Sequence, residues 1–522
     1  MKILTAAQMR AVDRRCIESM GIAGFTLMEN ASLQVYAELW KRWPDLELKR
    51  VTIVCGKGNN GGDGLATARH ICSRGGQVRV ILLARTGDLK GDALTNLDAA
   101  RAAGVQISEA TDEASWHAAW SEAPPEIVVD ALFGTGLAAP ATGIAARAIE
   151  EINSSGAWVL AIDVPSGLSS DTGEVLQPSV RANVTVALQC LKLCHAVPPA
   201  CDRCGDVALV PIGIPADALE DPTHRIEMLD PGVASCLPTR RRDSHKGHYG
   251  HALVVAGSMG KTGAAVMTGM AAYRAGAGLV TVATPWSCLP IVASGAAEIM
   301  TEALPETVDG TIDRKAAERV RDLAGGRDVL LIGPGVTTNA STVAAVREII
   351  RTRTLPVVVD ADAISCFAND YQLLKAAPEA PPVLITPHPG ELSRLLGKSI
   401  GEILRDRVGI ASQVACELGL YVVLKGYRSI IATPSGDVFI NPTGNPGMAT
   451  GGSGDVLTGI AGGLLAQGVP LPQAANFAVY IHGLAGDLAA RETGEVSLVA
   501  TDLLRFLPAA FRTAAAAVPS PS

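Results

Sequence analysis

Short runs of apolar, mostly β-branched residues alternate with helix-length segments along the first 210 residues of the chain. The runs cover residues 50–55, 77–83, 126–130, 158–163 and 184–188. Strands separated by helix-length segments predict βαβ units and a parallel sheet. Ligands of such sheets bind at the carboxyl ends of the strands. We therefore expect Asp130 and Asp163, which end two of the runs, to lie at that edge.

The alternating pattern weakens between residues 213 and 245, where prolines and an Arg-Arg-Arg run replace it. Such a stretch is typical of a domain boundary. A second series of apolar runs follows, at residues 250–256, 279–282, 329–332, 356–360, 383–386 and 421–425. The sequence therefore predicts two α/β domains, residues 1–220 and residues 235–512.

Composition narrows the class of protein. Hydrophobic residues make up 48% of the 522 residues and the net charge is -8, with no long basic run, which disfavours nucleic-acid binding. The first residues lack the features of a signal peptide, and we expect a cytoplasmic location. The uncharged segment between Asp455 and Asp487 contains Pro470 and Pro472. It therefore predicts two buried helices joined by a turn, not a membrane span.

The 11 cysteines are scattered, which is typical of reduced thiols, but one stretch is dense in cysteine. It contains Cys190, Cys194, His195, Cys201 and Cys204. The last two cysteines have a spacing found in zinc sites, although no second such pair completes a standard site. The sequence leaves open whether this stretch binds a structural metal or consists of ordinary buried thiols.

A glycine-rich string follows the first predicted strand. Residues 56–64 read Gly-Lys-Gly-Asn-Asn-Gly-Gly-Asp-Gly. A tight strand-to-helix turn needs one or two glycines, whereas this string has five in nine residues. Glycine lets a backbone approach a ligand closely, so we expect a binding loop.

Two further polar loops follow strands of the same predicted sheet. They begin at Asp130 and Asp163 and contain Gly134, Thr135, Gly136 and Ser166. Their carboxylate and hydroxyl oxygens, with the amide oxygens of the glycine-rich string, suit a hard cation. For Asp163 we weigh acid–base catalysis against simple helix capping.

The second half has its own glycine-rich loop, residues 450–459, at the start of a helical stretch. Backbone N–H groups there form an anion site, and Asp455 can act as the base of a phosphoryl transfer. The alternative is a glycine turn capped by the aspartate. Residues 257–262 end like a P-loop, but Val255 occupies a position that must be glycine, so we exclude one.

The first three motifs, with Met28-Glu29-Asn30-Ala31, resemble the NAD(P)H-hydrate epimerases over residues 1–220. The resemblance implies a Rossmann-like three-layer αβα domain. It implies that Asp163 is the catalytic acid or base and that Lys192 lies near the substrate. It implies potassium ligands Asn60, Asp130 and Ser166. The implied substrate-binding residues are Asp163, Asn59, Asn60, Gly61, Gly62, Asp63, and 134–140, which include Gly134, Thr135, Gly136 and Leu137.

The second half resembles the ribokinase-like ADP-dependent NAD(P)H-hydrate dehydratases over residues 240–510. The matching segments are 245–250, 255–258, 276–281, 333–335, 360–363, 386–391, 425–426 and 441–449. The resemblance implies Mg²⁺ and ADP as cofactors and Asp455 as catalytic base. The implied substrate-binding residues are Ala264, Gly335, His388 and Asp455. The implied nucleotide-binding residues are Lys425, Gly426, Tyr427, Arg428, Ser429 and Gly454.

Together the two resemblances imply a bifunctional enzyme that repairs hydrated NADH and NADPH. One domain would interconvert the R and S forms, and the other would dehydrate the S form at the expense of ADP, giving AMP and phosphate. We expect a homo-oligomer with small-molecule substrates and neither nucleic-acid nor membrane partners. Two alternatives are a vitamin kinase with a regulatory N-terminal domain and a cofactor-sensing scaffold. ADP against ATP and NADH against NADPH preference stay open.

Overall fold

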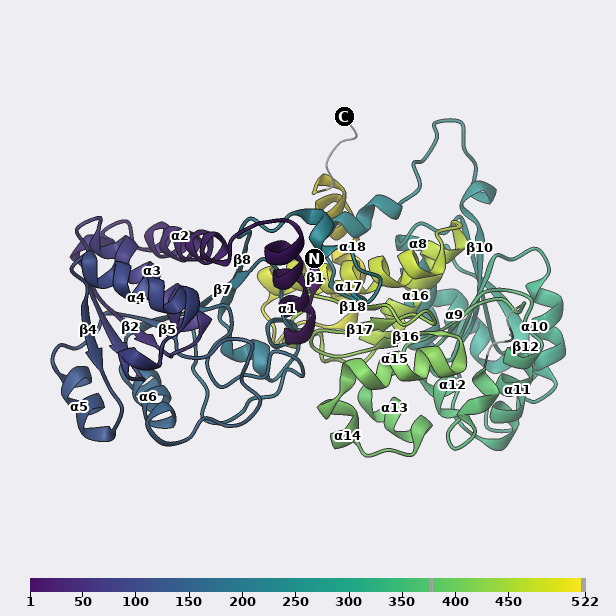
Figure 1. Cartoon of the computed structure of the whole chain (residues 1–522). Helices are drawn as coiled ribbons and strands as arrows, with labels where there is room; N and C mark the ends of the chain where they lie inside the picture. Colours follow the sequence, from purple (N-terminus) through teal and green to yellow (C-terminus); the bar gives the residue numbers. More distant parts are fainter. Residues whose placement is uncertain (376, 378, 518–522) are drawn as a thin grey trace. The chain divides into compact units, whose positions relative to one another are not determined.

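The computed structural model describes residues 1–375, 377 and 379–517, which divide into two compact units (Figure 1). The N-terminal unit is Met1–Ile226 and the C-terminal unit is Glu227–Ser522. Each unit has its own sheet and its own hydrophobic core.

The N-terminal unit is built on a seven-stranded sheet in the order β4-β3-β2-β5-β6-β7-β8, and every pairing is parallel. All five predicted strands are present, and β4 and β8 at the two edges are additional. The strands are β2 (Arg50–Cys55), β3 (Gln77–Leu82), β4 (Gln106–Glu109), β5 (Ile127–Ala131), β6 (Trp158–Ile162), β7 (Val184–Leu188) and β8 (Asp206–Val210). The central strands are almost wholly buried, as expected for a sheet covered on both faces.

Helices cover both faces of this sheet. In Figure 1, α2, α3 and α4 lie on one side and α5 and α6 on the other, and separate hydrophobic clusters fill the two sides. The helices are α1 (Ala6–Arg14), α2 (Gly24–Arg42), α3 (Asn59–Cys72), α4 (Gly91–Ala102), α5 (Glu113–Ser121), α6 (Gly143–Ser154) and α7 (Leu193–Ala196). This arrangement is the predicted three-layer αβα fold. The short strand β1 (Lys2–Ile3) runs beside Leu191, which brings the start of the chain next to Lys192.

The C-terminal unit has a mixed sheet in the order β18-β17-β16-β15-β14-β13-β10-β11-β12. Its parallel part contains the six predicted strands together with β12. The parallel strands are β10 (His251–Val255), β11 (Leu279–Pro285), β12 (Met300–Leu304), β13 (Val329–Ile332), β14 (Val357–Val359), β15 (Val383–Ile385) and β16 (Tyr421–Leu424). Antiparallel strands β17 (Ile430–Ala432) and β18 (Val438–Ile440) extend it. Strand β9 (Ile226–Met228) spans the division between the units.

Helices also cover both faces of the second sheet, the arrangement expected of a ribokinase-like domain. They are α8 (Thr262–Arg274), α9 (Leu289–Gly295), α10 (Ala316–Ala324), α11 (Ala340–Arg351), α12 (Asp362–Ser365), α13 (Pro389–Leu396), α14 (Ile400–Arg405), α15 (Arg407–Leu418), α16 (Ser453–Ala466), α17 (Leu471–Thr493) and α18 (Ala500–Ala516). Helices α8, α16, α17 and α18 share one core cluster. Helices α16 and α17 are the two buried helices predicted for the uncharged segment, and among the described residues no helix is long and apolar enough to cross a membrane.

Candidate active sites

The three residues expected to hold potassium lie in one chain of hydrogen bonds at the carboxyl ends of β2, β5 and β6. The side-chain amide of Asn60 donates to the carbonyl of Phe133 at 3.0 Å. The amide of Phe133 donates to the Ser166 hydroxyl at 2.9 Å. Ser166 in turn donates its hydroxyl and its amide to the two carboxylate oxygens of Asp130, at 2.6 and 2.7 Å. The structure therefore brings Asn60, Asp130 and Ser166 together.

Asp130 is fully buried inside β5 and makes no ion pair with any described residue. Burial raises its pKa to about 6, and the hydrogen bonds from Ser166 and Leu132 oppose that shift. A buried carboxylate that lacks a basic partner is costly unless a cation offsets its charge. The oxygen ligands around Asp130 fit a hard monovalent cation.

Asp163 is paired with Lys192. Asp163 directly follows β6 with a backbone φ of 61°, and its carboxylate accepts a short hydrogen bond from the Lys192 ammonium. The Leu188 amide donates to the same carboxylate oxygen at 3.1 Å, and the Lys192 ammonium also donates to the Leu188 carbonyl at 3.1 Å. Lys192 is 1% exposed, so its charge is screened little by water. The Asp163 carboxylate and the Lys192 ammonium therefore form a buried ion pair.

Two further carboxyls interact electrostatically with this pair. Asp63, within α3, is buried, and burial with the charge of Asp163 raises its pKa well above the usual range. Burial likewise raises the pKa of Asp13, on α1, to about 6, which Lys192 opposes and Asp163 reinforces. The sequence analysis missed Asp13, because an acidic residue on an amphipathic helix ordinarily faces solvent. The site thus combines one carboxylate beside a cation with two carboxyls that favour the protonated form.

Most glycines of the glycine-rich string pack closely against neighbouring atoms. A Cβ atom at Gly61 would lie 1.8 Å from the Gly56 carbonyl oxygen, and one at Gly56 would lie 2.1 Å from the Leu132 carbonyl oxygen. At Gly64 it would meet Ala131 and Cys55 at 2.6 and 2.7 Å. Gly62 is similarly enclosed, by Met28 at 2.8 Å. Only Gly58, the residue before α3, has nothing within 4 Å.

The remaining predicted substrate residues of this unit lie beside the same chain of hydrogen bonds. A Cβ atom at Gly134 would lie 3.4 Å from that of Asn60, and the Ser170 hydroxyl donates to the Thr135 carbonyl at 3.3 Å. Gly136 is exposed and Leu137 half-buried. Asn59, exposed, begins α3, whose first turn receives no side-chain cap from the described residues. The free backbone amide groups at the start of α3 favour an anion.

In the C-terminal unit a second buried ion pair lies next to the glycine-rich loop of residues 450–459. The Lys425 ammonium donates to Asp360 at 2.6 Å and lies 3.7 Å from Glu391. The Thr458 hydroxyl donates to the other oxygen of Asp360 at 2.6 Å. Burial alone would lower the pKa of Lys425, but Asp360 and Glu391 more than offset it and the net direction is upward.

Asp455 lies close to this pair, in the first turn of α16. Burial raises its pKa to about 7; Asp360 reinforces the shift and Lys425 opposes it. Gly454 separates the helix from the pair: a Cβ atom there would lie 3.3 Å from the Lys425 ammonium and 3.6 Å from Asp360. Helix α16 begins after Gly452 without a side-chain cap from the described residues. Asp455 is thus a base that titrates near neutrality beside free amide groups.

The predicted substrate residues of this unit come together around Asp362. Gly335, with a φ of 68°, packs against Lys261 and Ala264: a Cβ atom at Gly335 would lie 3.3 Å from the Ala264 Cβ. The Lys261 ammonium lies 3.2 Å from Asp362, whose charge also helps to raise the Asp455 pKa. This group therefore adjoins Asp455.

His388 begins α13 beside Glu391. Its Nδ1 accepts hydrogen bonds from the amides of Gly390 and Glu391, at 3.0 and 3.3 Å, and its Nε2 lies 3.4 Å from the Glu391 carboxylate. The His388 side chain is 50% exposed and so is accessible to a ligand. Because Glu391 also faces Lys425, His388 borders the ion pair.

The predicted nucleotide-binding segment is held from below by a residue that the sequence analysis missed. Arg407 is buried and donates to the carbonyls of Tyr427 and Arg428, at 2.8 and 3.2 Å. The Ser429 hydroxyl donates to the Gly426 carbonyl at 2.8 Å. Tyr427 is half exposed, with the Arg428 guanidinium 5.5 Å from its ring. The segment therefore presents an aromatic face and a positive charge next to Lys425.

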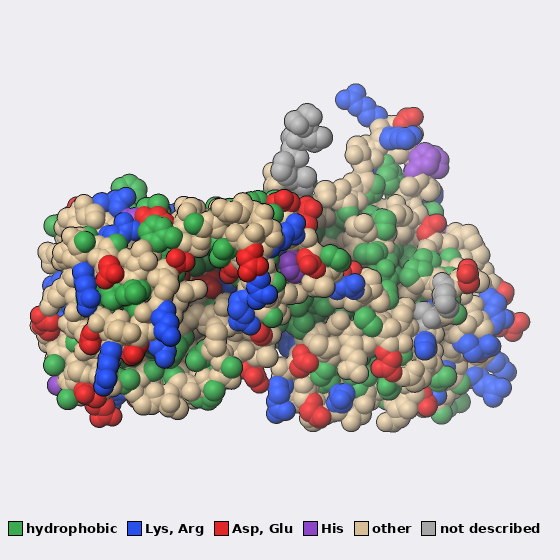
Figure 2. Space-filling model, viewed as in Figure 1, with side chains coloured by type: hydrophobic (Ala, Val, Ile, Leu, Met, Phe, Trp, Pro, Cys, Tyr) green, Lys and Arg blue, Asp and Glu red, His purple; other side chains and the backbone are tan. Residues whose placement is uncertain are grey.

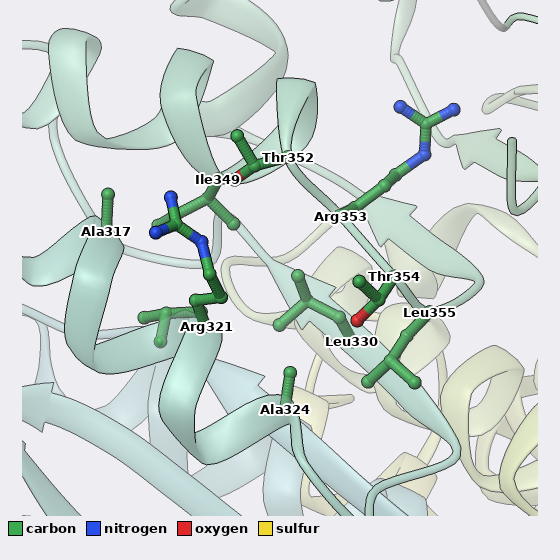
Figure 3. A pocket seen from close by; sticks show the side chains of 10 residues that line it. Ala317, Arg321, Ala324, Leu330, Ile349, Thr352, Arg353, Thr354 and Leu355 are labelled. Carbon is green, nitrogen blue, oxygen red and sulfur yellow. The ribbon is translucent and has the colours of Figure 1, made fainter.

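The cavity drawn in Figure 3 lies elsewhere. It lies between α10 and α11, open to solvent, and its lining includes Leu330, Leu355 and Arg321. These leucines stand at the amino ends of β13 and β14, opposite the carboxyl ends that carry Gly333 and Asp360. This cavity is not part of the candidate active site.

The cysteine-rich stretch forms a buried turn. The Cys204 thiol lies 3.5 Å from the carbonyls of Cys194 and Ala200, and Cys201 lies beside Asp202. Among the described residues no group of three or more His, Cys, Asp or Glu side chains is arranged to hold a metal ion.

Comparison with known proteins agrees with the division into two sites. Residues 24–194 match the family described as YjeF-related protein N-terminus, and residues 252–509 match NAD(P)H-hydrate dehydratase. A bifunctional NAD(P)H-hydrate repair enzyme of Moorella thermoacetica is 42% identical over 98% of this chain and 97% of its own. The chain belongs to the family of bifunctional NAD(P)H-hydrate repair enzymes.

Other members of this repair family cover the chain equally well. The repair enzyme of Thermofilum pendens is 39% identical over 98% of this chain and 96% of its own. A solved structure of the ADP/ATP-dependent NAD(P)H-hydrate dehydratase of Bacillus subtilis, co-crystallized with ATP and Mg²⁺, is 33% identical. It covers 55% of this chain and 98% of its own, with a TM-score of 0.49.

Proposed function

We propose that this repair enzyme interconverts the R and S forms of hydrated NADH and NADPH in residues 1–220 and dehydrates the S form in residues 235–512, consuming ADP. The observation that carries the proposal is that each unit has a buried lysine paired with a carboxylate at the carboxyl ends of its parallel strands. Lys192 pairs with Asp163 itself, whereas Lys425 pairs with Asp360 and Glu391, beside Asp455. Family membership over nearly the whole chain supports the same pairing of activities.

Epimerisation requires the ring carbon that bears the hydroxyl to lose water and regain it on the other face. The ring nitrogen lone pair stabilises the cation formed when the protonated hydroxyl leaves. Asp163, paired with Lys192, takes the proton of the incoming water. Asp63, whose pKa is raised by burial, supplies the proton to the departing hydroxyl. One site thus contains both a base and an acid, although all its titrating groups are carboxyls.

The substrate would be held by the loops around this pair, namely by Asn59, Asn60, Gly61, Gly62, Asp63, Gly134, Thr135, Gly136, Leu137 and Asp163. Potassium would be held by Asn60, Asp130 and Ser166, where its charge would offset that of the buried Asp130 carboxylate. The packing found for Gly61 and Gly62 leaves their backbone amides as the groups that would contact the substrate.

Dehydration is difficult because hydroxide is a poor leaving group. Asp455 takes the proton of the ring hydroxyl, whose oxygen attacks the β-phosphorus of ADP and releases AMP. Phosphate then leaves, pushed by the ring nitrogen lone pair, and loss of a ring proton restores NADH or NADPH. Ala264, Gly335, His388 and Asp455 would contact the substrate. The nucleotide would lie against Lys425, Gly426, Tyr427, Arg428, Ser429 and Gly454.

Mg²⁺ would supply charge compensation on the phosphates of the nucleotide. It usually keeps several waters and binds one or two carboxylates together with the phosphates. Asp360, Asp362, Glu391 and Asp455 lie around this position, so the donor chemistry fits. The free amides at the start of α16 would stabilise the transferred phosphoryl group.

The surface is compatible with small-molecule substrates. Acidic and basic side chains are interspersed over the face seen in Figure 2, with no broad patch of one charge. Exposed Met300 on the edge strand β12, with Trp286 and Ile291 before it in the sequence, supports a homo-oligomer.

The test is to incubate the protein with mixed epimers of hydrated NADH, Mg²⁺, K⁺ and ADP, and to follow the absorbance of NADH. We expect complete conversion of both epimers. Asp455→Ala should reduce conversion at least 100-fold. Asp163→Ala should leave the R epimer converting only at its spontaneous rate. No NADH formation with either ADP or ATP would contradict the proposal, and phosphorylation of an added vitamin alcohol would point to a kinase instead.

A further inference from the structure

His195 is buried beside the Asp163–Lys192 pair, yet the proposed chemistry does not use it. It lies on the one-turn helix α7 and is 2% exposed. The sequence analysis grouped it with the neighbouring cysteines as a potential metal ligand. Its hydrogen bonds indicate a different role.

Both ring nitrogens of His195 bond to the main chain of the pair. Nδ1 lies 3.1 Å from the amide of Lys192 and accepts its hydrogen. Nε2 lies 2.8 Å from the carbonyl of Asp163. Because Nδ1 is an acceptor, the ring proton is on Nε2 and is donated to Asp163. Burial lowers the pKa of His195 to about 4, so the ring is neutral near pH 7. Neither nitrogen is left to bind a metal.

The backbone of Asp163 needs such support. Its φ of 61° is in the left-handed region, which costs a residue with a side chain about 1–3 kcal/mol unless the surroundings hold it there. Its amide donates to the Val186 carbonyl at 2.9 Å, which holds one side of the residue. The bond from His195 to its carbonyl holds the other side.

We propose that His195 is a positioning residue of the epimerase site, which joins the Asp163 carbonyl to the Lys192 amide and so holds the two side chains in contact. The inference rests on the proposed epimerase function. Lys192 comes from the segment after β7 and Asp163 from the end of β6, and the imidazole spans the two. The Cys204 thiol against the Cys194 carbonyl supports the same turn from behind.

Substitutions that separate the two hydrogen bonds test the role. In His195→Gln the side-chain amide can reach the position of Nε2 and donate to Asp163, whereas His195→Leu keeps neither bond. We expect the Leu variant to lose about 10- to 100-fold in epimerase kcat with little change in KM for the hydrated cofactor, since misplacement of reacting groups by about 1 Å has effects of that size. The Gln variant should recover most of that loss.

Two controls show whether a loss is specific. Dehydration of the S epimer by the same chain should be unchanged in both variants. His224→Leu removes another buried histidine of the N-terminal unit, whose Nδ1 meets the Leu219 carbonyl at 2.9 Å, and should leave epimerase kcat within about twofold.

The outcomes distinguish this inference from the proposed function. Normal epimerase kcat in His195→Leu, or a loss in His195→Gln as large as in His195→Leu, would overturn the positioning role while leaving the epimerase assignment intact. Absence of epimerase activity in the unsubstituted protein would overturn the assignment itself. If the Leu variant fails to fold, as judged by thermal melting of the N-terminal unit, the Gln variant alone decides, with near-normal kcat expected.

Discussion

Each candidate active site contains a buried lysine paired with a carboxylate, but the pair has a different role in the two sites. In the N-terminal unit the lysine binds the aspartate that we propose reacts, Asp163. In the C-terminal unit the lysine binds Asp360 and Glu391 instead, and the proposed base, Asp455, stands beside them. The lysine of the N-terminal unit therefore contacts the proposed catalytic carboxylate directly, whereas Lys425 is paired with carboxylates other than the proposed base.

This difference explains why the two proposed bases have different environments. Asp455 is surrounded by more negative than positive charge, because Asp360, Asp362 and Glu391 all face it together with Lys425. Its pKa is therefore raised to about 7. A base of that strength suits the removal of a hydroxyl proton near neutral pH. In the proposed epimerase site two different carboxyls take the two roles, Asp163 as the base and Asp63 as the acid.

Replacement of the lysine in the N-terminal unit should have the largest effect. Lys192→Met removes the ammonium that contacts Asp163 and leaves that carboxylate without its ion-pair partner. We expect epimerase kcat to fall about 100-fold or more, because the proposed base is no longer held in place. Chromatographic separation of the two epimers measures the rate.

The matched substitution in the C-terminal unit is Lys425→Met. It should impair dehydration and leave epimerisation unchanged, since the two pairs belong to different units. Equal epimerase rates in Lys192→Met and the unsubstituted protein would show that the ion pair does not control the base. That result would contradict the proposed difference between the roles of the two lysines.

We expect a smaller effect on the dehydration rate from a change of pH. Asp455 must be ionised to accept a proton, so kcat/KM should be constant above pH 7 and fall about tenfold for each pH unit below it. Asp360→Asn removes a negative neighbour and frees Lys425, so the acid limb should move downward by about one pH unit or more. A limb at an unchanged pH in Asp360→Asn would contradict the role of Asp360.

Much of this arrangement could be predicted from the sequence, because its signals are local. Apolar runs separated by helix-length segments predicted the parallel strands, and polar residues at their ends predicted the edge that carries Asp130 and Asp163. The second glycine-rich loop predicted Asp455 at the start of a helix. Strands β1, β4, β8, β9, β12, β17 and β18 were missed. They lie at or toward the sheet edges and are two to five residues long, so their periodicity is too short to detect.

The residues that complete the sites could not be found in this way, since their roles depend on contacts between distant segments. Asp13 reaches the epimerase site from a surface-type helix, and Arg407 supports the nucleotide segment from 20 residues away. The close packing at Gly56, Gly61, Gly62 and Gly64 could not be predicted either, because a sequence pattern does not show which atoms a glycine will face.

The smallest expected effect concerns the second glycine-rich loop, where Gly452 and Gly459 are also enclosed by packing and Gly454 lies next to the Lys425 pair. Gly454→Ala places a methyl group 3.3 Å from the Lys425 ammonium, so the ion pair must move by a few tenths of an ångström. We expect the KM for ADP to rise about three- to tenfold, while alanine within the first turn of α16 leaves stability unchanged or raises it by up to about 1 kcal/mol. Gly58→Ala, with nothing within 4 Å, is the matched control and should change neither stability nor dehydration. A shift of the Lys425 pair should change the binding of any nucleotide that contacts the pair. An unchanged KM for ADP in Gly454→Ala would therefore mean that the nucleotide does not approach it.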